Sequence, residues 1–218
     1  MILFAGDSFS MYHTPDTWVD ILSNNLKTGH WNLSLGGSSI WYAYTKIISR
    51  KNEIVNGNFK YIILTCTSPQ RIPFCQDESA SHYVGNPAPN KKYFTEEFNL
   101  DIWHFSYFER FYSRDLHKFL FKKILEDMVK ELSSYTKLVL LPCFAESYTI
   151  IKEVYENNPN FLYLNFPLMS IYNEKFDNTN HFNLKTNKIF GNLLSKSILE
   201  QNIGILNFNN QDIHEATK

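Results

Sequence analysis

A serine and a histidine at opposite ends of the chain have surroundings that suit nucleophilic chemistry. Ser8 closes the stretch ILFAGDS, in which a short apolar run (residues 2–5) ends at Gly6 and Asp7. A hydroxyl beside backbone N–H groups, at the turn after a buried strand, is well placed to attack a carbonyl. His181, in DNTNHFN, is a residue type that can take up its proton near neutral pH. Taken alone, the first motif also fits an ordinary turn and the second a surface loop.

Paired glycines follow the second apolar run, in NLSLGGSSI. Gly36 and Gly37 leave backbone N–H groups uncovered by side chains, which suits a site that holds a developing oxyanion. The same residues fit a tight turn into a helix, with Ser38 or Ser39 as its cap. Both interpretations end a strand at this point.

Short apolar runs alternate with stretches of helical periodicity, a pattern that favours a parallel sheet with helices on both faces. The five predicted strands are residues 2–5, 31–35, 61–66, 138–143 and 161–166. The predicted helices are residues 14–26, 41–55, 105–134, 146–157 and 183–201. Reactive groups in such a sheet collect at the carboxyl ends of the strands, which is where Ser8 falls.

The alternation breaks after the third strand, because residues 69–103 hold four of the eight prolines and show no sustained period. An insertion over about 69–112 is therefore expected. It is rich in aromatic residues, and rings beside polar groups suit sugar faces, so Trp103 and Tyr107 are predicted to bind substrate. Packing as a cap, or contact in an oligomer, would explain the rings equally well.

The composition describes one ordinary globular domain, residues 1–201, followed by a polar tail over 202–218. A net charge of −1 argues against a nucleic-acid partner. Three cysteines without metal-type spacing argue against a disulfide framework or zinc site. No signal peptide or membrane span is visible, which predicts a cytoplasmic protein that could also be carried on a virus particle or released by lysis. The oligomeric state is left open.

With Ser8, Gly37 and His181 in this order, residues 2–200 resemble the SGNH, or GDSL-type, hydrolases. These are esterases, lipases and carbohydrate deacetylases with a flavodoxin-like three-layer α/β/α fold. The resemblance implies that Ser8 is the nucleophile and His181 the base. It also implies that the N–H groups of Ser8 and Gly37 hold the oxyanion, and that no metal or other cofactor takes part.

Two blocks depart from the family pattern. Where the family has an asparagine after the third strand, YIILTCTSPQR has Ser68, whose hydroxyl, or that of Thr67, could donate to the oxyanion. Arg71, close by, could bind an anionic substrate group or be a solvated or ion-paired loop residue. The family's Asp three residues before the histidine is here Asn178. Asp177, one residue earlier, is the preferred partner to orient His181, and Asn178 is the alternative. If neither orients the ring, Ser8 and His181 would act as a dyad.

The sequence thus predicts a serine esterase that hydrolyses O-acyl esters, with O-acetyl groups on a carbohydrate as the preferred substrate. The alternatives are a catalytically weak domain that binds a glycan or builds an assembly, and an O-acyltransferase that uses the same residues.

Overall fold

The computed structural model describes residues 1–11, 16–71, 113–172 and 181–217. Within them, six strands form one sheet in the order β2-β1-β3-β4-β5-β6, and every neighbouring pair is parallel. The strands are β1 (Ile2–Gly6), β2 (His30–Asn32), β3 (Tyr61–Cys66), β4 (Lys137–Pro142), β5 (Leu162–Tyr163) and β6 (Gly204–Ile205). The helices are α1 (Trp18–Asn25), α2 (Ile40–Ile48), α3 (Lys51–Val55), α6 (Arg114–Leu132), α7 (Ala145–Asn157), the 3-10 helix η1 (Leu168–Ile171), α8 (Leu184–Glu200) and α9 (Asn210–Thr217).

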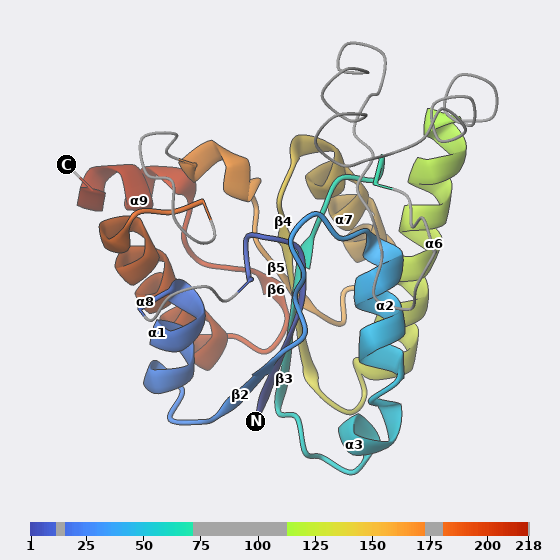
Figure 1. Ribbon diagram of the computed structural model, residues 1–218, viewed down its shortest axis with the longest axis horizontal. Helices are drawn as coiled ribbons and strands as arrows, with labels where there is room; N and C mark the ends of the chain where they lie inside the picture. Colours follow the sequence, from blue (N-terminus) through green and yellow to red (C-terminus); the bar gives the residue numbers. More distant parts are fainter. Residues whose placement is uncertain (12–15, 72–112, 173–180, 218) are drawn as a thin grey trace, which may run out of the picture.

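Helices cover both faces of the sheet, with α1, α8 and α9 on one side and α2, α6 and α7 on the other (Figure 1). The central strands are apolar on both faces, as strands buried on both sides must be. In β1, Ile2 and Phe4 join the core under α1 and α8, and Leu3 and Ala5 join the core under α2 and α6. The predicted three-layer α/β/α architecture is confirmed.

The sheet has six strands where the sequence predicts five. The sixth lies in residues 202–218, the expected polar tail, which contributes both β6 and α9. Leu206, Phe208 and Ile213 are buried in the core that α8 covers. Such apolar residues are few among the polar residues of 202–218, and β6 extends the sheet by pairing with β5.

Candidate active site

The turn after β1 requires a glycine at its first position. Gly6 has φ +133°, and a Cβ placed there would lie 2.1 Å from Thr65 Oγ1 on β3. The neighbouring Asp7 N–H donates to that same hydroxyl oxygen over 3.1 Å. This close approach of β1 to β3 directs the chain out of the sheet, so that Ser8 follows at the carboxyl edge.

Ser8 meets His181 there, although the two residues lie 173 positions apart. Ser8 Oγ is 2.7 Å from His181 Nε2, and both residues are partly buried. The structure therefore brings together the two residues that the sequence predicts to react.

His181 is held by the residues that begin α8. Phe182 is buried and contacts the rings of Phe9 and Phe190, while Asn183 caps the helix by accepting from Thr186 N–H over 2.8 Å. Asn187 then joins this end of α8 to the start of α1. Its Oδ1 accepts from Trp18 N–H over 2.9 Å, and its Nδ2 donates to the Phe182 carbonyl over 3.0 Å.

The His181 ring lies between two aromatic rings. The Phe9 ring centroid is 4.7 Å away and that of Tyr172 is 5.5 Å away. Burial lowers the pKa of His181 from its ordinary value of 6.5, with a raising contribution from Asp7 and a lowering one from Arg71. The imidazole is therefore favoured in its neutral form, which can accept a proton.

Backbone donors lie beside the hydroxyl. Gly36 packs against Ser8, because a Cβ at Gly36 would lie 3.9 Å from Ser8 Cβ, and the next residue, Gly37, has φ +73°. Among the described residues, neither Ser8 N–H nor Gly37 N–H has an acceptor, whereas Gly36 N–H donates to Met11 Sδ over 3.0 Å. These two N–H groups, on the turns that carry Ser8 and Gly37, are of the kind that an oxyanion site needs.

Asp7 braces the turn. Its Oδ1 accepts from Phe9 N–H over 3.1 Å and from the Cys143 thiol over 3.4 Å. Burial is the main cause that raises the pKa of Cys143 well above its usual range, and the negative charge of Asp7 raises it further. This thiol therefore stays protonated and acts as a donor. On its other side, Asp7 Oδ2 forms an ion pair with Arg71 Nη1 over 3.1 Å. Of the two roles open to Arg71, the ion pair is present, and binding of a substrate anion stays a prediction.

Ser68, the third predicted oxyanion residue, already takes part in a local turn. Ser68 Oγ accepts from Gln70 N–H over 3.3 Å, and the Ser68 carbonyl accepts from Arg71 N–H over 3.1 Å, which closes a turn. The Thr67 hydroxyl is buried and has no hydrogen-bond partner in the part of the chain that is described. A donor role for either hydroxyl stays a prediction.

Several predicted residues lie outside the described ranges. They are Asp177 and Asn178, which precede His181 in the sequence, Trp103 and Tyr107, and nearly all of the insertion expected over 69–112. Their roles stay predictions.

The sequence missed several neighbours of the site, including Cys143, Phe9 and Tyr172. Cys143 could have been found, because it is the last residue of the predicted strand 138–143 and must reach the same edge as Ser8. Nothing in the sequence marked Tyr172, which follows the 3-10 helix η1.

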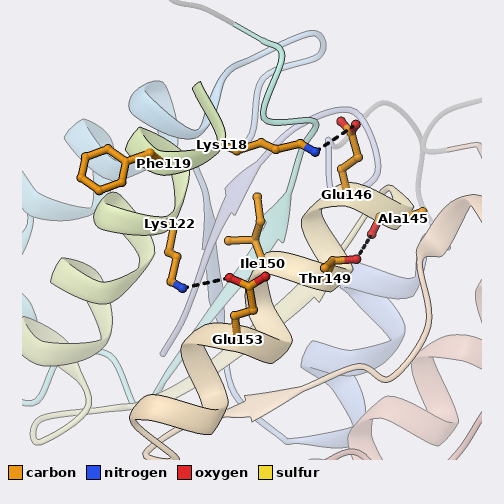
Figure 2. Close-up of a pocket in the computed structure, with 8 residues that line it drawn as sticks. All are labelled: Lys118, Phe119, Lys122, Ala145, Glu146, Thr149, Ile150 and Glu153. Carbon is orange, nitrogen blue, oxygen red and sulfur yellow. Dashed lines mark hydrogen bonds and ion pairs between the residues drawn. The ribbon is translucent and has the colours of Figure 1, made fainter. Parts of the chain in front are cut away.

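A hollow of about 380 Å³ lies between α6 and α7 (Figure 2). Lys122 pairs with Glu153 over 2.9 Å, and Lys118 pairs with Glu146 over 3.9 Å, so helix charges that face each other across it neutralise one another. None of the predicted site residues within the described ranges lines this hollow.

Neither a metal site nor a membrane span is found in the described ranges. They contain no group of three or more His, Cys, Asp or Glu side chains that could hold a metal ion. None of their helices is long and apolar enough to cross a membrane.

The fold is similar to those of solved esterase structures. A carbohydrate esterase whose active site displays divergent catalytic and non-catalytic binding functions is 10% identical, with a TM-score of 0.54 over 92% of this chain and 64% of that one. A carbohydrate esterase family 2 enzyme with a carbohydrate binding domain, from Corynascus thermopiles (Myceliophthora fergusii), is 10% identical, with a TM-score of 0.51 over 91% and 65%. TesA is 12% identical, with a TM-score of 0.51 over 91% and 98%.

These likenesses concern the fold alone. The sequence matches no protein-family model and no curated protein, and this chain spans slightly less than two thirds of each carbohydrate esterase. The chain has the α/β fold of these solved structures, in line with the SGNH/GDSL-type fold expected from its motifs.

Proposed function

We propose that this protein is a serine hydrolase of carboxylic esters, with Ser8 as nucleophile and His181 as base. The observation that carries the proposal is the 2.7 Å contact between Ser8 Oγ and His181 Nε2 at the carboxyl edge of a parallel sheet. The open N–H groups of Ser8 and Gly37 support it, because they supply donors where a tetrahedral oxyanion would form.

The reaction follows from these positions. His181 Nε2 takes the Ser8 proton as Oγ attacks the ester carbonyl, and the oxyanion is held by the N–H groups of Ser8 and Gly37. Ser68 or Thr67 would be a third donor. The carbon–oxygen bond to the alcohol then breaks, and His181 returns the proton to the departing alcohol. Water, deprotonated by His181, releases the acid from Ser8 and restores the enzyme. Asp177 is the proposed partner of His181 Nδ1.

We further propose an O-acetyl group on a carbohydrate as the substrate. Two carbohydrate esterases share the fold, and the segment after β3 carries Trp103 and Tyr107, whose rings suit the C–H faces of a sugar. Transfer of the acyl group to a second sugar hydroxyl would use the same residues, with that hydroxyl in place of water.

The test is acetate release from p-nitrophenyl acetate and from acetylated xylan, for the wild-type protein and Ser8→Ala. Ser49→Ala is the matched control, because the exposed Ser49 hydroxyl only donates to the Lys46 carbonyl. We expect release by the wild type and the control but not by Ser8→Ala. Absence of release by the wild type on every ester would contradict hydrolysis. Acetylated sugar formed from an added acceptor would identify a transferase.

A further inference from the structure

Arg71 reaches from the loop after β3 to both loops that carry the candidate reactive groups. Its Nη1 donates to Asp7 Oδ2 over 3.1 Å and to the Ser38 carbonyl over 3.4 Å. Asp7 precedes Ser8, and Ser38 follows Gly37. One guanidinium nitrogen therefore joins the turn of the nucleophile to the turn of the oxyanion donor.

The ion pair is buried. The Asp7 side chain is 0% exposed and that of Arg71 is 10% exposed, with the guanidinium over the Phe144 ring at 5.5 Å. Buried ion pairs are weak sources of stability, because desolvation offsets most of the attraction between the charges. Stability alone therefore gives little reason for a charge pair at this place.

The geometry around Arg71 limits how the two turns can rotate. The turns are already joined by hydrogen bonds, among them the one from the Ser38 hydroxyl to the Gly6 carbonyl over 2.7 Å. The contacts from Arg71 to Asp7 and to the Ser38 carbonyl add a connection through a charged side chain. Arg71 itself is fixed by the turn in which its N–H donates to the Ser68 carbonyl over 3.1 Å.

Charge is the second contribution of this pair. Among the described residues, the charged groups that act on the His181 ring are Asp7 from the β1 turn and Arg71 from the β3 loop, and the rings of Phe9 and Tyr172 contact it. Asp7 raises the pKa of His181, and Arg71 lowers it. The two effects oppose each other, so the pair leaves His181 governed mainly by its burial.

We propose, on the basis of the hydrolase function above, that Arg71 is a positioning residue. It bridges Asp7 and Ser38, fixes Ser8 relative to the Gly37 N–H, and balances the charge of Asp7 beside His181.

The test compares the wild type with Arg71→Lys, Arg71→Met and the double variant Asp7→Asn/Arg71→Met. The readouts are kcat and KM on p-nitrophenyl acetate and the pKa of the His181 ring from an NMR titration. The double variant removes both charges, so it leaves no unpaired buried carboxylate and keeps the test valid if Arg71→Met fails to fold.

Arg71→Lys keeps the charge but replaces the planar guanidinium, whose Nη1 reaches both Asp7 Oδ2 and the Ser38 carbonyl, by a shorter side chain that ends in an ammonium. We expect it to leave the His181 pKa near that of the wild type and to lower kcat about ten- to a hundred-fold, with little change in KM, because misplaced groups cost rate. We expect Arg71→Met to raise the His181 pKa and the double variant to bring it back. Arg50→Met, which breaks an ion pair with Glu53 on α3, is the control and should change none of these values.

Full kcat in Arg71→Lys would overturn the positioning role, and a His181 pKa unchanged in Arg71→Met would overturn the charge balance. Failure of the hydrolase function itself would look different, because the wild type would then show no turnover and the His181 titration would still report on the charges.

Discussion

The carboxyl edge around Ser8 and the hollow between α6 and α7 both gather polar side chains, but in opposite ways. In the hollow, lysines of α6 pair with glutamates of α7, and the paired side chains are partly exposed. Around Ser8 the charges of Asp7 and Arg71 are buried, and the N–H groups of Ser8 and Gly37 are left without acceptors among the described residues. The comparison shows two ways of placing polar groups: paired with each other on a partly exposed helix surface, or buried beside the contact between Ser8 and His181.

The largest expected effect is the loss of ester hydrolysis in Ser8→Ala. Removing the nucleophile of a serine hydrolase costs at least about a thousand-fold in kcat, since only the oxyanion donors and substrate binding remain. Steady-state kinetics on p-nitrophenyl acetate measure it. A Ser8→Ala variant that keeps a tenth of the wild-type rate would mean that another residue is the nucleophile.

Removing one partner of the buried pair should cost far more stability than removing one partner of an exposed pair in the hollow, although the intact buried pair adds little by itself. Asp7→Ala leaves a buried guanidinium without its carboxylate, so the free energy of unfolding should fall by about 3–5 kcal/mol. Lys122→Met, which breaks a partly exposed pair, should cost at most about 1 kcal/mol. Urea unfolding of both variants gives the two values, and equal losses would contradict the distinction.

The turn that presents Ser8 should not tolerate a side chain at Gly6. In Gly6→Ala the φ of +133° is strained and the new Cβ overlaps Thr65 Oγ1, so we expect a loss of at least about 2 kcal/mol. Gly29→Ala is the control, because no atom lies within 4 Å of a Cβ at this position, and it should change stability by less than about 0.5 kcal/mol. Thermal unfolding of the pair measures both, and a stable Gly6→Ala would mean that the turn has another conformation.

Hydrolysis should also depend on pH through His181. The neutral imidazole is the active base and burial lowers its pKa below 6.5, so kcat/KM should be at its plateau at pH 7 and fall as the pH drops below 6.5. Because the folded pKa is below the unfolded one, the stability linked to this group is present above pH 6.5 and is lost on acidification. A pH–rate profile with its acid limb centred above pH 7 would contradict this environment.

The smallest effect is expected in the hollow itself. Glu153→Gln breaks the pair with Lys122 and should leave kcat and KM on p-nitrophenyl acetate unchanged within about two-fold, because surface pairs contribute little and none touches Ser8. A ten-fold change would mean that the two regions are coupled.

The sequence predictions were most accurate where they depended on local patterns of residue type. The alternation of apolar runs and helical periods was enough for the parallel α/β fold, and Gly6-Asp7-Ser8 marked the strand end where His181 is found. The strand β6 was missed because it is only two residues long, Gly204 and Ile205, within a segment taken for a polar tail, and it pairs with β5 alone. Such contacts depend on tertiary packing, which a single sequence does not display.

The partners of Arg71 could not be predicted for the same reason. The sequence placed Arg71 at the correct edge of the sheet, but its contact with Asp7 depends on the turn that begins at Ser68 and on the burial of both side chains. The predicted helix over 41–55 is likewise divided into α2 and α3, with Ser49 ending the first and Arg50 preceding the second.

Activation of Ser8 by His181 can be measured by labelling with a fluorophosphonate, a reagent that reacts with activated serine hydroxyls. We expect the wild-type protein to be labelled on the peptide that contains Ser8, and His181→Ala to be labelled at least about a hundred-fold more slowly. An unlabelled wild-type protein, or equal labelling of the two proteins, would contradict it.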